Sequence, residues 1–391
     1  MGAVRSVSAL LLAAAVGAGV AIGVNRLDDG GDRDSTTVVL PVSETSGGGP
    51  STAPPLLGNG FDPAAIYTAR SPGVVTIYAS VAGSAAQGAG FVVDAKGTIL
   101  TNAHVITNVA TSSEVVGADR VYVEYADGDR APARVVGWDL FSDVGVIDVD
   151  PADHAVSPVP LGRSAAVRVG QPVAAIGSPF GNQNSLAVGV VSATGRSIAS
   201  LTSGYDVADA IQIDAPINRG NSGGPLFDAA GRVIGINAQI NTNSGVAEGV
   251  GFAIPIDTVK RALAQIAATG RAAYAYIGIT TQDLLPGLAR ELELPVSDGA
   301  LVARVETGTP AETAGLQGGT GLRTYNGLEI STGGDIVLAI AGNRVRSAED
   351  VSRIVVGKLS PGQKVPFLVL RDGKRITVSV TLGERPARPA G

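Results

Sequence analysis

The feature that most constrains the fold of this chain is a series of short apolar runs separated by turn residues between residues 74 and 256. Val74-Val-Thr-Ile-Tyr78 and Gly90-Phe-Val-Val93 are two such runs, and Val121-Tyr-Val-Glu-Tyr125 is a third. In the third run apolar residues alternate with Tyr122 and Glu124, which is typical of a strand buried on one face. Many short strands with few helical periods predict an all-β sandwich or barrel, and the pattern by itself does not choose between them.

A glycine-rich stretch late in this region has the composition of a catalytic turn. In Gly220-Asn-Ser-Gly-Gly-Pro225, Ser222 lies between glycines, which adopt positive φ and let the backbone approach a substrate closely. An acyl-transfer site needs its serine on such a turn, with backbone amides facing the developing oxyanion. The alternative is an ordinary glycine-rich loop between two strands.

A serine nucleophile requires a histidine and a buried carboxylate, and few residues can supply them. The chain has two histidines. His104, in Thr101-Asn-Ala-His-Val105, follows a short polar turn that can carry a side chain to a cleft edge, whereas His154 follows a polar connection and is expected to be a solvated loop residue. Asp143 directly precedes an apolar run and is expected at the border of the core, while Asp139 is expected to be a turn residue.

Together these motifs resemble the HtrA (Deg) family of trypsin-like serine proteases. Four further segments look like segments of that family and follow in its order: residues 87–93, 177–181, 189–193 and 251–255. The resemblance covers residues 63–265 and departs from the family at Val144-Gly145, where Leu/Ile-Ala is usual. It implies a mostly β fold, a chymotrypsin-like double β-barrel with a triad of His104, Asp143 and Ser222 between the barrels.

Substrate-facing groups follow from the same resemblance. The amides of Gly220 and Ser222, with Asn221 between them, are expected to form the oxyanion hole. Trypsin-like folds select Lys or Arg through an acid six residues before the serine, and here that position is Pro216, so we expect cleavage after small or medium aliphatic residues. Asp214 leaves an acidic pocket open as the alternative. The strand expected beside the substrate consists of Ile236, Asn237, Ala238 and Gln239.

A second domain is expected from residue 272 to residue 383. Ser347 is predicted to begin a helix with an apolar face that includes Val351 and Val355, and Thr309 is predicted to begin a shorter helix with a capping box. The stretch resembles a PDZ domain of α+β type, with an insert at residues 320–332. The resemblance implies that C-terminal peptides bind at Tyr276, Ile277, Gly278, Ile279, Val351 and Val355.

The N-terminus carries an uncharged run from Val7 to Val24. As a helix it would span about 27 Å, enough for a bilayer core, so residues 1–26 are predicted to be a membrane anchor, with a cleaved secretory signal as the alternative. Arg5 before the run and acidic residues after it predict that the bulk of the chain lies outside the cytoplasm. Residues 27–62 are predicted to be a flexible linker, residues 63–268 the protease domain and residues 384–391 a tail. A helix with Asp257 as N-cap and Gly270 as C-cap candidate is predicted to close the protease domain.

Composition excludes several other functions. With 391 residues the chain is expected to form two or three units. A net charge of −6 argues against a nucleic-acid surface, the absence of cysteine excludes a thiol nucleophile, and two distant histidines argue against a catalytic metal. The sequence therefore predicts an envelope-anchored serine endopeptidase that needs no cofactor. A catalytically silent PDZ scaffold and a chaperone-like holder remain alternatives. The resemblance also implies a homotrimer, for which Phe61 and Tyr67 are candidate contacts.

Overall fold

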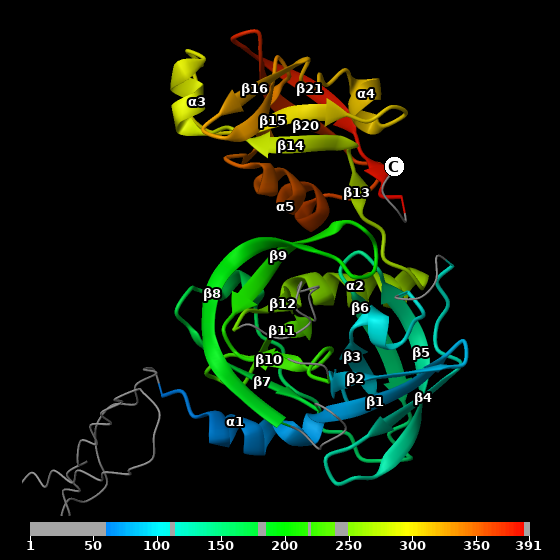
Figure 1. Ribbon diagram of the computed structural model, residues 1–391. Helices are drawn as coiled ribbons and strands as arrows, with labels where there is room; N and C mark the ends of the chain where they lie inside the picture. The colour runs from blue at the N-terminus through cyan, green and yellow to red at the C-terminus, as the bar shows by residue number, and fades with distance from the viewer. Residues whose placement is uncertain (1–59, 110–113, 179–184, 218–219, 239–248, 387–391) are drawn as a thin grey trace, which may run out of the picture. The chain divides into compact units, whose positions relative to one another are not determined.

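The computed structural model describes residues 60–109, 114–178, 185–217, 220–238 and 249–386 (Figure 1). The predicted anchor or signal segment lies outside these ranges, as do residues 27–59 of the predicted linker, Gln239 and residues 387–391. None of the helices in the described ranges is long and apolar enough to cross a membrane.

The expected all-β region forms two closed barrels, which decides between the sandwich and the barrel. The first barrel has the order β1-β2-β3-β6-β5-β4 and is built from β1 (Val74–Val81), β2 (Ser84–Val92), β3 (Thr98–Thr101), β4 (Arg120–Glu124), β5 (Arg130–Asp139) and β6 (Val144–Val149). The second has the order β10-β11-β12-β9-β8-β7 and is built from β7 (Pro172–Gly177), β8 (Ser185–Ala199), β9 (Asp206–Ile213), β10 (Pro225–Phe227), β11 (Val233–Ala238) and β12 (Gly251–Pro255).

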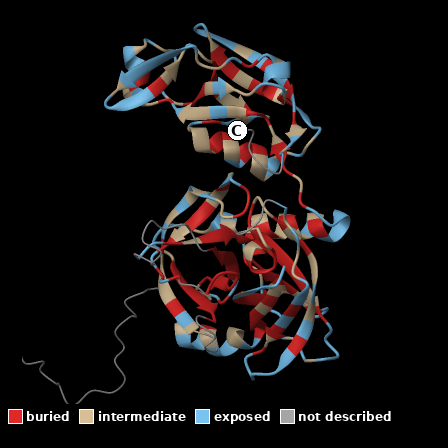
Figure 2. Ribbon diagram, turned by 45° about the vertical axis from the view of Figure 1, so that its right-hand side comes forward, coloured by how far each residue is buried: buried red, intermediate tan, exposed pale blue. Residues whose placement is uncertain are grey.

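Each barrel has its own apolar core. Ile77 and Ile147 pack inside the first barrel, and Ile213 and Leu226 pack inside the second. A third cluster contains side chains of both barrels, such as Phe91 and Phe227, and fixes one barrel against the other. Figure 2 shows buried residues in red along the strands.

Two helices flank the barrels, and each corrects an expectation. Before β1 lies α1 (Pro63–Arg70), preceded by Phe61, which is 5% exposed and packs in the cluster shared by the barrels. Most of the Phe61 ring is thus buried within its own chain, which leaves little of it for the subunit contact expected from the sequence. After β12 lies α2 (Ile256–Thr269), which ends at Gly270 with φ +75° as predicted. Its N-cap is Pro255 and not Asp257, whose carboxylate instead accepts a hydrogen bond from the amide of Ala165 at 2.9 Å. Short 3₁₀ helices occupy Ser71–Gly73, Ala103–Val105 and Ser164–Ala166.

The C-terminal domain is an α+β unit, as predicted. Its main sheet has the order β14-β15-β18-β20-β21, with β14 (Ile279–Asp283), β15 (Ala300–Val305), β18 (Ile336–Ile340), β20 (Lys364–Arg371) and β21 (Lys374–Thr381); β19 (Asn343–Arg344) pairs with β18. Its helices are α3 (Pro286–Glu291), α4 (Pro310–Ala314) and α5 (Ala348–Lys358). Two smaller sheets pair β13 (Ala275–Tyr276) with β22 (Gly383–Glu384), and β16 (Gly321–Tyr325) with β17 (Leu328–Thr332).

Local signals in this domain are confirmed with one exception. The hydroxyl of Ser347 accepts from the amide of Asp350 at 3.2 Å and caps α5, as predicted. Thr309 begins α4 without a side-chain cap, and Glu312 reaches the amide of Gly308 at 2.7 Å. The expected capping box is wrong because the hydroxyl of Thr309 bonds backward to the carbonyl of Glu306.

Candidate active site

The pairing of β3 with β6 brings His104 beside Asp143. Thr101 pairs with Gly145, so the residues that follow β3 and those that precede β6 meet at one end of the first barrel. Nδ1 of His104 lies 2.8 Å from Oδ2 of Asp143, and Oδ1 accepts from the amide of His104 at 3.0 Å. One carboxylate therefore orients both the ring and the backbone of the histidine.

The backbone of Asp143 is held in an uncommon conformation. Its φ of +52° lies in the left-handed region, which costs a non-glycine residue roughly 1–2 kcal/mol. Its carbonyl accepts hydrogen bonds from the amide of Ala103 at 3.2 Å and from Nδ2 of Asn102 at 2.9 Å. These bonds offset the cost, and they tie Asp143 to the two residues directly before His104.

Opposing effects set the pKa of His104. Burial lowers the pKa of the ring, but the charge of Asp143 and its hydrogen bond together raise it more, so the net pKa lies above the ordinary value of 6.5. Because Nδ1 faces the carboxylate, the imidazole that results from this pairing has Nε2 available as the base.

The second barrel supplies Ser222, directly before β10. Its carbonyl accepts from the amide of Ala89 in the first barrel at 2.9 Å, which brings the serine turn against the segment that carries His104. Gly223 has φ +85°, and a Cβ there would lie 2.3 Å from the carbonyl oxygen of Ala89 and 2.4 Å from Oγ1 of Thr101. The close approach of the two barrels at this point thus requires glycine. Ser222 is 3% exposed, and its Oγ has no hydrogen-bond partner among the described residues.

The rest of the serine turn is fixed by its own contacts. Gly220 has φ +99°, and its carbonyl accepts from the amide of Ser178 at 3.1 Å. Asn221 is 4% exposed, and its Nδ2 donates to the carbonyl of Pro216 at 3.4 Å. The predicted oxyanion residues therefore sit on a turn that glycine conformation and buried contacts hold in place.

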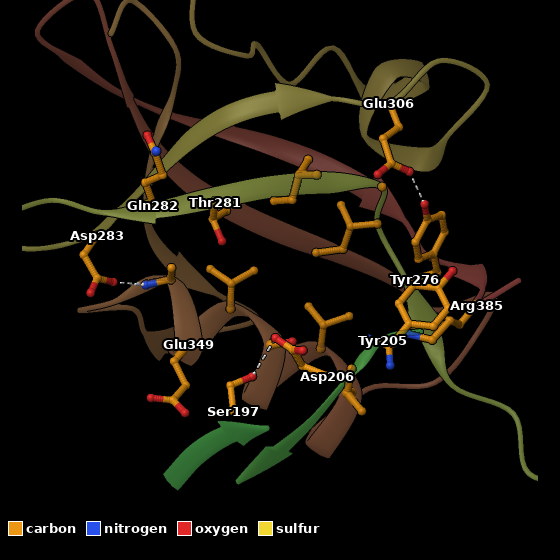
Figure 3. Close-up of a pocket in the computed structure, with 18 of the residues that line it drawn as sticks. Ser197, Tyr205, Asp206, Tyr276, Thr281, Gln282, Asp283, Glu306, Glu349 and Arg385 are labelled. Carbon is orange, nitrogen blue, oxygen red and sulfur yellow. Dashed lines mark hydrogen bonds between the residues drawn. The ribbon is translucent and has the colours of Figure 1, made fainter. Parts of the chain in front are cut away.

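The structure also brings together the predicted peptide-binding residues of the second domain. Among the described strands β14 pairs only with β15, and it lies near α5 on the other side. Ile277, Ile279, Val351 and Val355 line the space between β14 and α5. Figure 3 shows Tyr276 beside Glu306 at one end of this groove, with a hydrogen bond from the tyrosine hydroxyl to the carboxylate. The groove therefore has an apolar stretch beside an open strand edge, and polar residues such as Gln282, Asp283 and Glu349 line the same cavity.

Comparison with known proteins agrees with both domains. The family described as "Trypsin-like peptidase domain" matches residues 88–236, and that described as "PDZ domain" matches residues 275–382. A probable periplasmic serine endoprotease, DegP-like, of Hahella chejuensis is 40% identical and covers 78% of this chain and 58% of its own length. Protease Do-like 1, chloroplastic, of Arabidopsis thaliana is 40% identical and covers 77% of this chain and 64% of its own length.

The solved structure of the HtrA-type protease AlgW with tripeptide decides the family. It is 33% identical to this chain, with a TM-score of 0.68, and the match covers 83% of this chain and 98% of that one. The chain belongs to the HtrA family of serine proteases. It spans somewhat more than half the length of the DegP-like relatives from Hahella and Pseudomonas fluorescens.

In this HtrA protease, part of the expected substrate strand has another task. Asn237 is fully buried, its amide donates to the carbonyl of Gly224 at 2.8 Å, and its carbonyl accepts from the amide of Gly223 at 3.0 Å. Ile236 is also fully buried. Asn237 therefore supports the serine turn, while Ile236 packs in the core shared by the barrels and Ala238 is 5% exposed. Gln239 lies outside the described residues, and substrate binding by these four residues stays a prediction.

Asp214, the acid that could alter specificity, accepts a hydrogen bond from the backbone. Oδ1 of Asp214 accepts from the amide of Val190 at 2.6 Å, while Ala215 and Ile217 beside it are buried in the core of the second barrel. Asp214 is thus a structural acceptor at the start of this loop. His154 is equally accounted for, since its ring stacks on Tyr125 at 3.7 Å and Nε2 lies 2.9 Å from Asp127.

One buried cluster beside the triad was not predicted from the sequence. Asp139 is 2% exposed, and its carboxylate accepts from the amide of Phe141, the hydroxyl of Ser142 and the hydroxyl of Tyr274. Burial raises the pKa of Asp139 in spite of these bonds. Asp139 is a turn residue as expected, but its turn ends at Asp143 and is bonded to a tyrosine 135 residues away, a pairing for which the sequence holds no local signal.

Proposed function

We propose that this HtrA protease is an endopeptidase of extracytoplasmic proteins, in which His104, Asp143 and Ser222 form the triad. The hydrogen-bonded His104–Asp143 pair beside the glycine-bounded Ser222 turn carries this proposal. Several relatives are named as periplasmic endoproteases, which supports the compartment. The proposed substrates are misfolded proteins or specific proteins of the cell envelope.

The chemistry assigned to each residue follows from its contacts. Ser222 attacks the scissile carbonyl, Nε2 of His104 takes the hydroxyl proton and returns it to the leaving amine, and Asp143 stabilises the imidazolium. The amides of Gly220 and Ser222 bind the oxyanion. Within the described ranges the serine hydroxyl has no hydrogen-bond partner, and such bonds commonly form when substrate is present.

The specificity proposed is for an aliphatic side chain before the cleaved bond. Ala215 and Ile217 are buried apolar residues, and one oxygen of the exposed Asp214 carboxylate accepts from a backbone amide, which supports an apolar wall in this loop. Cleavage after Val, Ala or Leu is the expected pattern. Product mass spectra with cuts mainly after Lys or Arg would contradict it.

The second domain is proposed to capture C-terminal peptides. A peptide adds as a strand along the open edge of β14, with its last side chain among Ile277, Ile279, Val351 and Val355 and its carboxylate at Tyr276–Ile279. Glu306 lies beside this loop, where its carboxylate accepts from the hydroxyl of Tyr276 and lies 3.9 Å from the guanidinium of Arg304. AlgW, a family member, has been solved with a tripeptide and with a decapeptide.

The organisation proposed for the full chain is the one predicted from sequence. Residues 1–26 anchor the chain in the membrane or form a cleaved signal, residues 27–62 are a linker, residues 63–268 the protease domain and residues 272–383 the PDZ domain. Three copies assemble, as the family resemblance implies. Light scattering on the purified protein tests the assembly, and a monomer at micromolar concentration would contradict it.

The experiment that tests catalysis is labelling with a fluorophosphonate probe, followed by casein digestion. The wild-type chain is expected to be labelled and active, and both properties are expected to be lost in Ser222→Ala and nearly lost in His104→Ala. His154→Ala is the matched control and should keep both. An unlabelled wild-type chain that still binds peptides would favour the silent scaffold, and suppression of aggregation by Ser222→Ala would add a holder function.

A further inference from the structure

The insert at residues 320–332 forms the hairpin β16–β17, which has no place in the function proposed above. Its strands pair from Gly321 with Thr332 to Tyr325 with Leu328, around the turn Asn326-Gly327. Two leucines are exposed on it, Leu322 by 76% and Leu328 by 53%. Single exposed leucines need no explanation by themselves, so what matters is where each of the two lies.

The hairpin is fixed to the end of β14 that lies away from the carboxylate loop. Nε2 of Gln282 donates to the carbonyl of Glu329 at 3.1 Å, and Oε1 of Gln282 accepts from the amide of Ser331 at 2.9 Å. Figure 3 shows Gln282 and Asp283 at the opposite end of the groove from Tyr276 and Glu306. The hairpin therefore stands where a peptide bound along β14 would continue.

The register of the hairpin decides which leucine faces the groove. Residues opposite each other in an antiparallel pair share a face, so Tyr325, Leu328 and Ile330 lie on one face, and Leu322 lies with Ser331 on the other. Ile330 is 5% exposed and packs with Leu284 and Leu288 of the domain. Leu328 and Ile330 line the same cavity as Ile279 and Val351, whereas Leu322 does not.

We propose that the hairpin is the distal wall of the peptide groove, and that Leu328 with Ile330 receives an apolar side chain of the bound C-terminal segment. The inference rests on the strand addition proposed above. In a peptide paired with β14, each residue lies opposite one residue of the strand. If its carboxylate lies at Gly278, the peptide residues opposite Gln282 and Asp283 are those about four to six positions before the carboxylate. The domain thus contacts a bound C-terminal segment at two separate places, its carboxylate end and one side chain several residues before it.

Calorimetry with the full chain carrying Ser222→Ala, which prevents cleavage, tests this inference. The probes are a tripeptide ending in an apolar residue, a decapeptide ending in the same three residues with Leu five positions before the end, and the decapeptide with Ser there. The decapeptide with Leu is expected to bind about five- to tenfold more tightly than the other two, as partial burial of one leucine side chain allows.

Leu328→Ser is expected to remove this advantage and to leave the affinity for the tripeptide unchanged, which also shows that the domain remains folded. Leu322→Ser, on the opposite face of the hairpin, is the matched control and should keep the advantage. If Leu328→Ser does not fold, Leu328→Glu with Lys at the fifth position replaces it and should reverse the preference between Lys and Leu. A full leucine advantage in either Leu328 variant overturns the inference.

Amidated peptides separate this inference from the proposed capture of the carboxylate. If amidation leaves affinity unchanged while Leu328→Ser still weakens the decapeptide, carboxylate capture is wrong and the distal contact stands. If the tripeptide binds through its carboxylate and the decapeptides gain nothing, the distal contact is wrong and capture stands. If no peptide binds, both are overturned.

Discussion

At the level of residues, Asp143 does most to define the site. It bonds both the ring and the amide of His104, it occupies a left-handed conformation, and its carbonyl is held by Ala103 and Asn102. Each of these contacts joins residues about 40 positions apart, so the precision of the pair depends on the closure of the first barrel and not on local sequence.

The titration of His104 provides a test of this pairing. Because Asp143 raises the pKa of His104, the inactive imidazolium persists to a pH above 6.5, and kcat/KM is expected to rise with pH through that higher value. Asp143→Asn removes the charge and should lower the pKa of His104. Proton NMR of the two histidines measures this directly. Asp127→Asn is the control, since the hydrogen bond of Asp127 raises the pKa of His154, whereas the pKa of His104 is set by burial and Asp143.

Tyr274 provides the second test at this scale. Its hydroxyl bonds Asp139, whose turn ends at Asp143, so Tyr274→Phe leaves a buried carboxylate short of one donor at a cost of about 1–3 kcal/mol. Part of that cost should appear as a lower kcat with an unchanged KM, because the loss lies at the triad and not at the substrate cleft. Ser142→Ala should behave similarly. A lower melting temperature with unchanged kcat would show that the cluster is only structural.

At the level of elements, the proposed peptide groove depends on the loop between β13 and β14. Gly278 has φ +82°, and a Cβ there would lie 2.3–2.6 Å from the side chain of Thr309. A methyl group at this position must therefore displace either the loop or α4. The open edge of β14 keeps its geometry only while this loop is in place.

Gly278→Ala is expected to weaken binding of C-terminal peptides at least tenfold and to leave fluorophosphonate labelling of Ser222 unchanged. Gly308→Ala is the matched control, since Gly308 also has a positive φ, +75°, but has open space around its Cβ position. Calorimetry and probe labelling of the two variants measure the effects. Equal peptide affinity in both variants would exclude a role for the close contact with Thr309.

At the level of the whole molecule, the two proposed activities reside in separate folded domains with separate cores. If peptide capture controls proteolysis, a C-terminal peptide should raise turnover of a chromogenic substrate by settling the Gly220–Ser222 loop, and its amide should not. Turnover that is unchanged by saturating peptide would contradict the coupling. Gly278→Ala should lose the response and keep the basal rate.

Localisation is the other prediction for the whole molecule. An uncleaved anchor predicts that the protein remains with membranes after a carbonate wash, keeps its N-terminal residues and is degraded by protease added from outside. Recovery of a soluble form that begins near residue 20–30 would instead favour a cleaved signal.

The features that could be predicted from the sequence are those set by residues close together in the chain. The cap at Ser347, the glycine after α2 and the alternation at 121–125 depend on residues a few positions apart, and the structure confirms each. The mostly β fold class and the HtrA family were also predicted correctly, since the motifs around His104, Asp143 and Ser222 are contiguous in sequence.

Only the tertiary structure decided the features that depend on distant pairs. Closure of the strands into two barrels, the use of Asn237 to hold the serine turn, and the bond from Tyr274 to Asp139 join elements far apart in the chain. The same holds for Leu328, because the pairing of β17 with β16 and the bond from Gln282 together fix which face of the hairpin it lies on and where that face points. Many residues look equally suitable as partners in the sequence, and only long-range packing brings these particular residues together at the two sites.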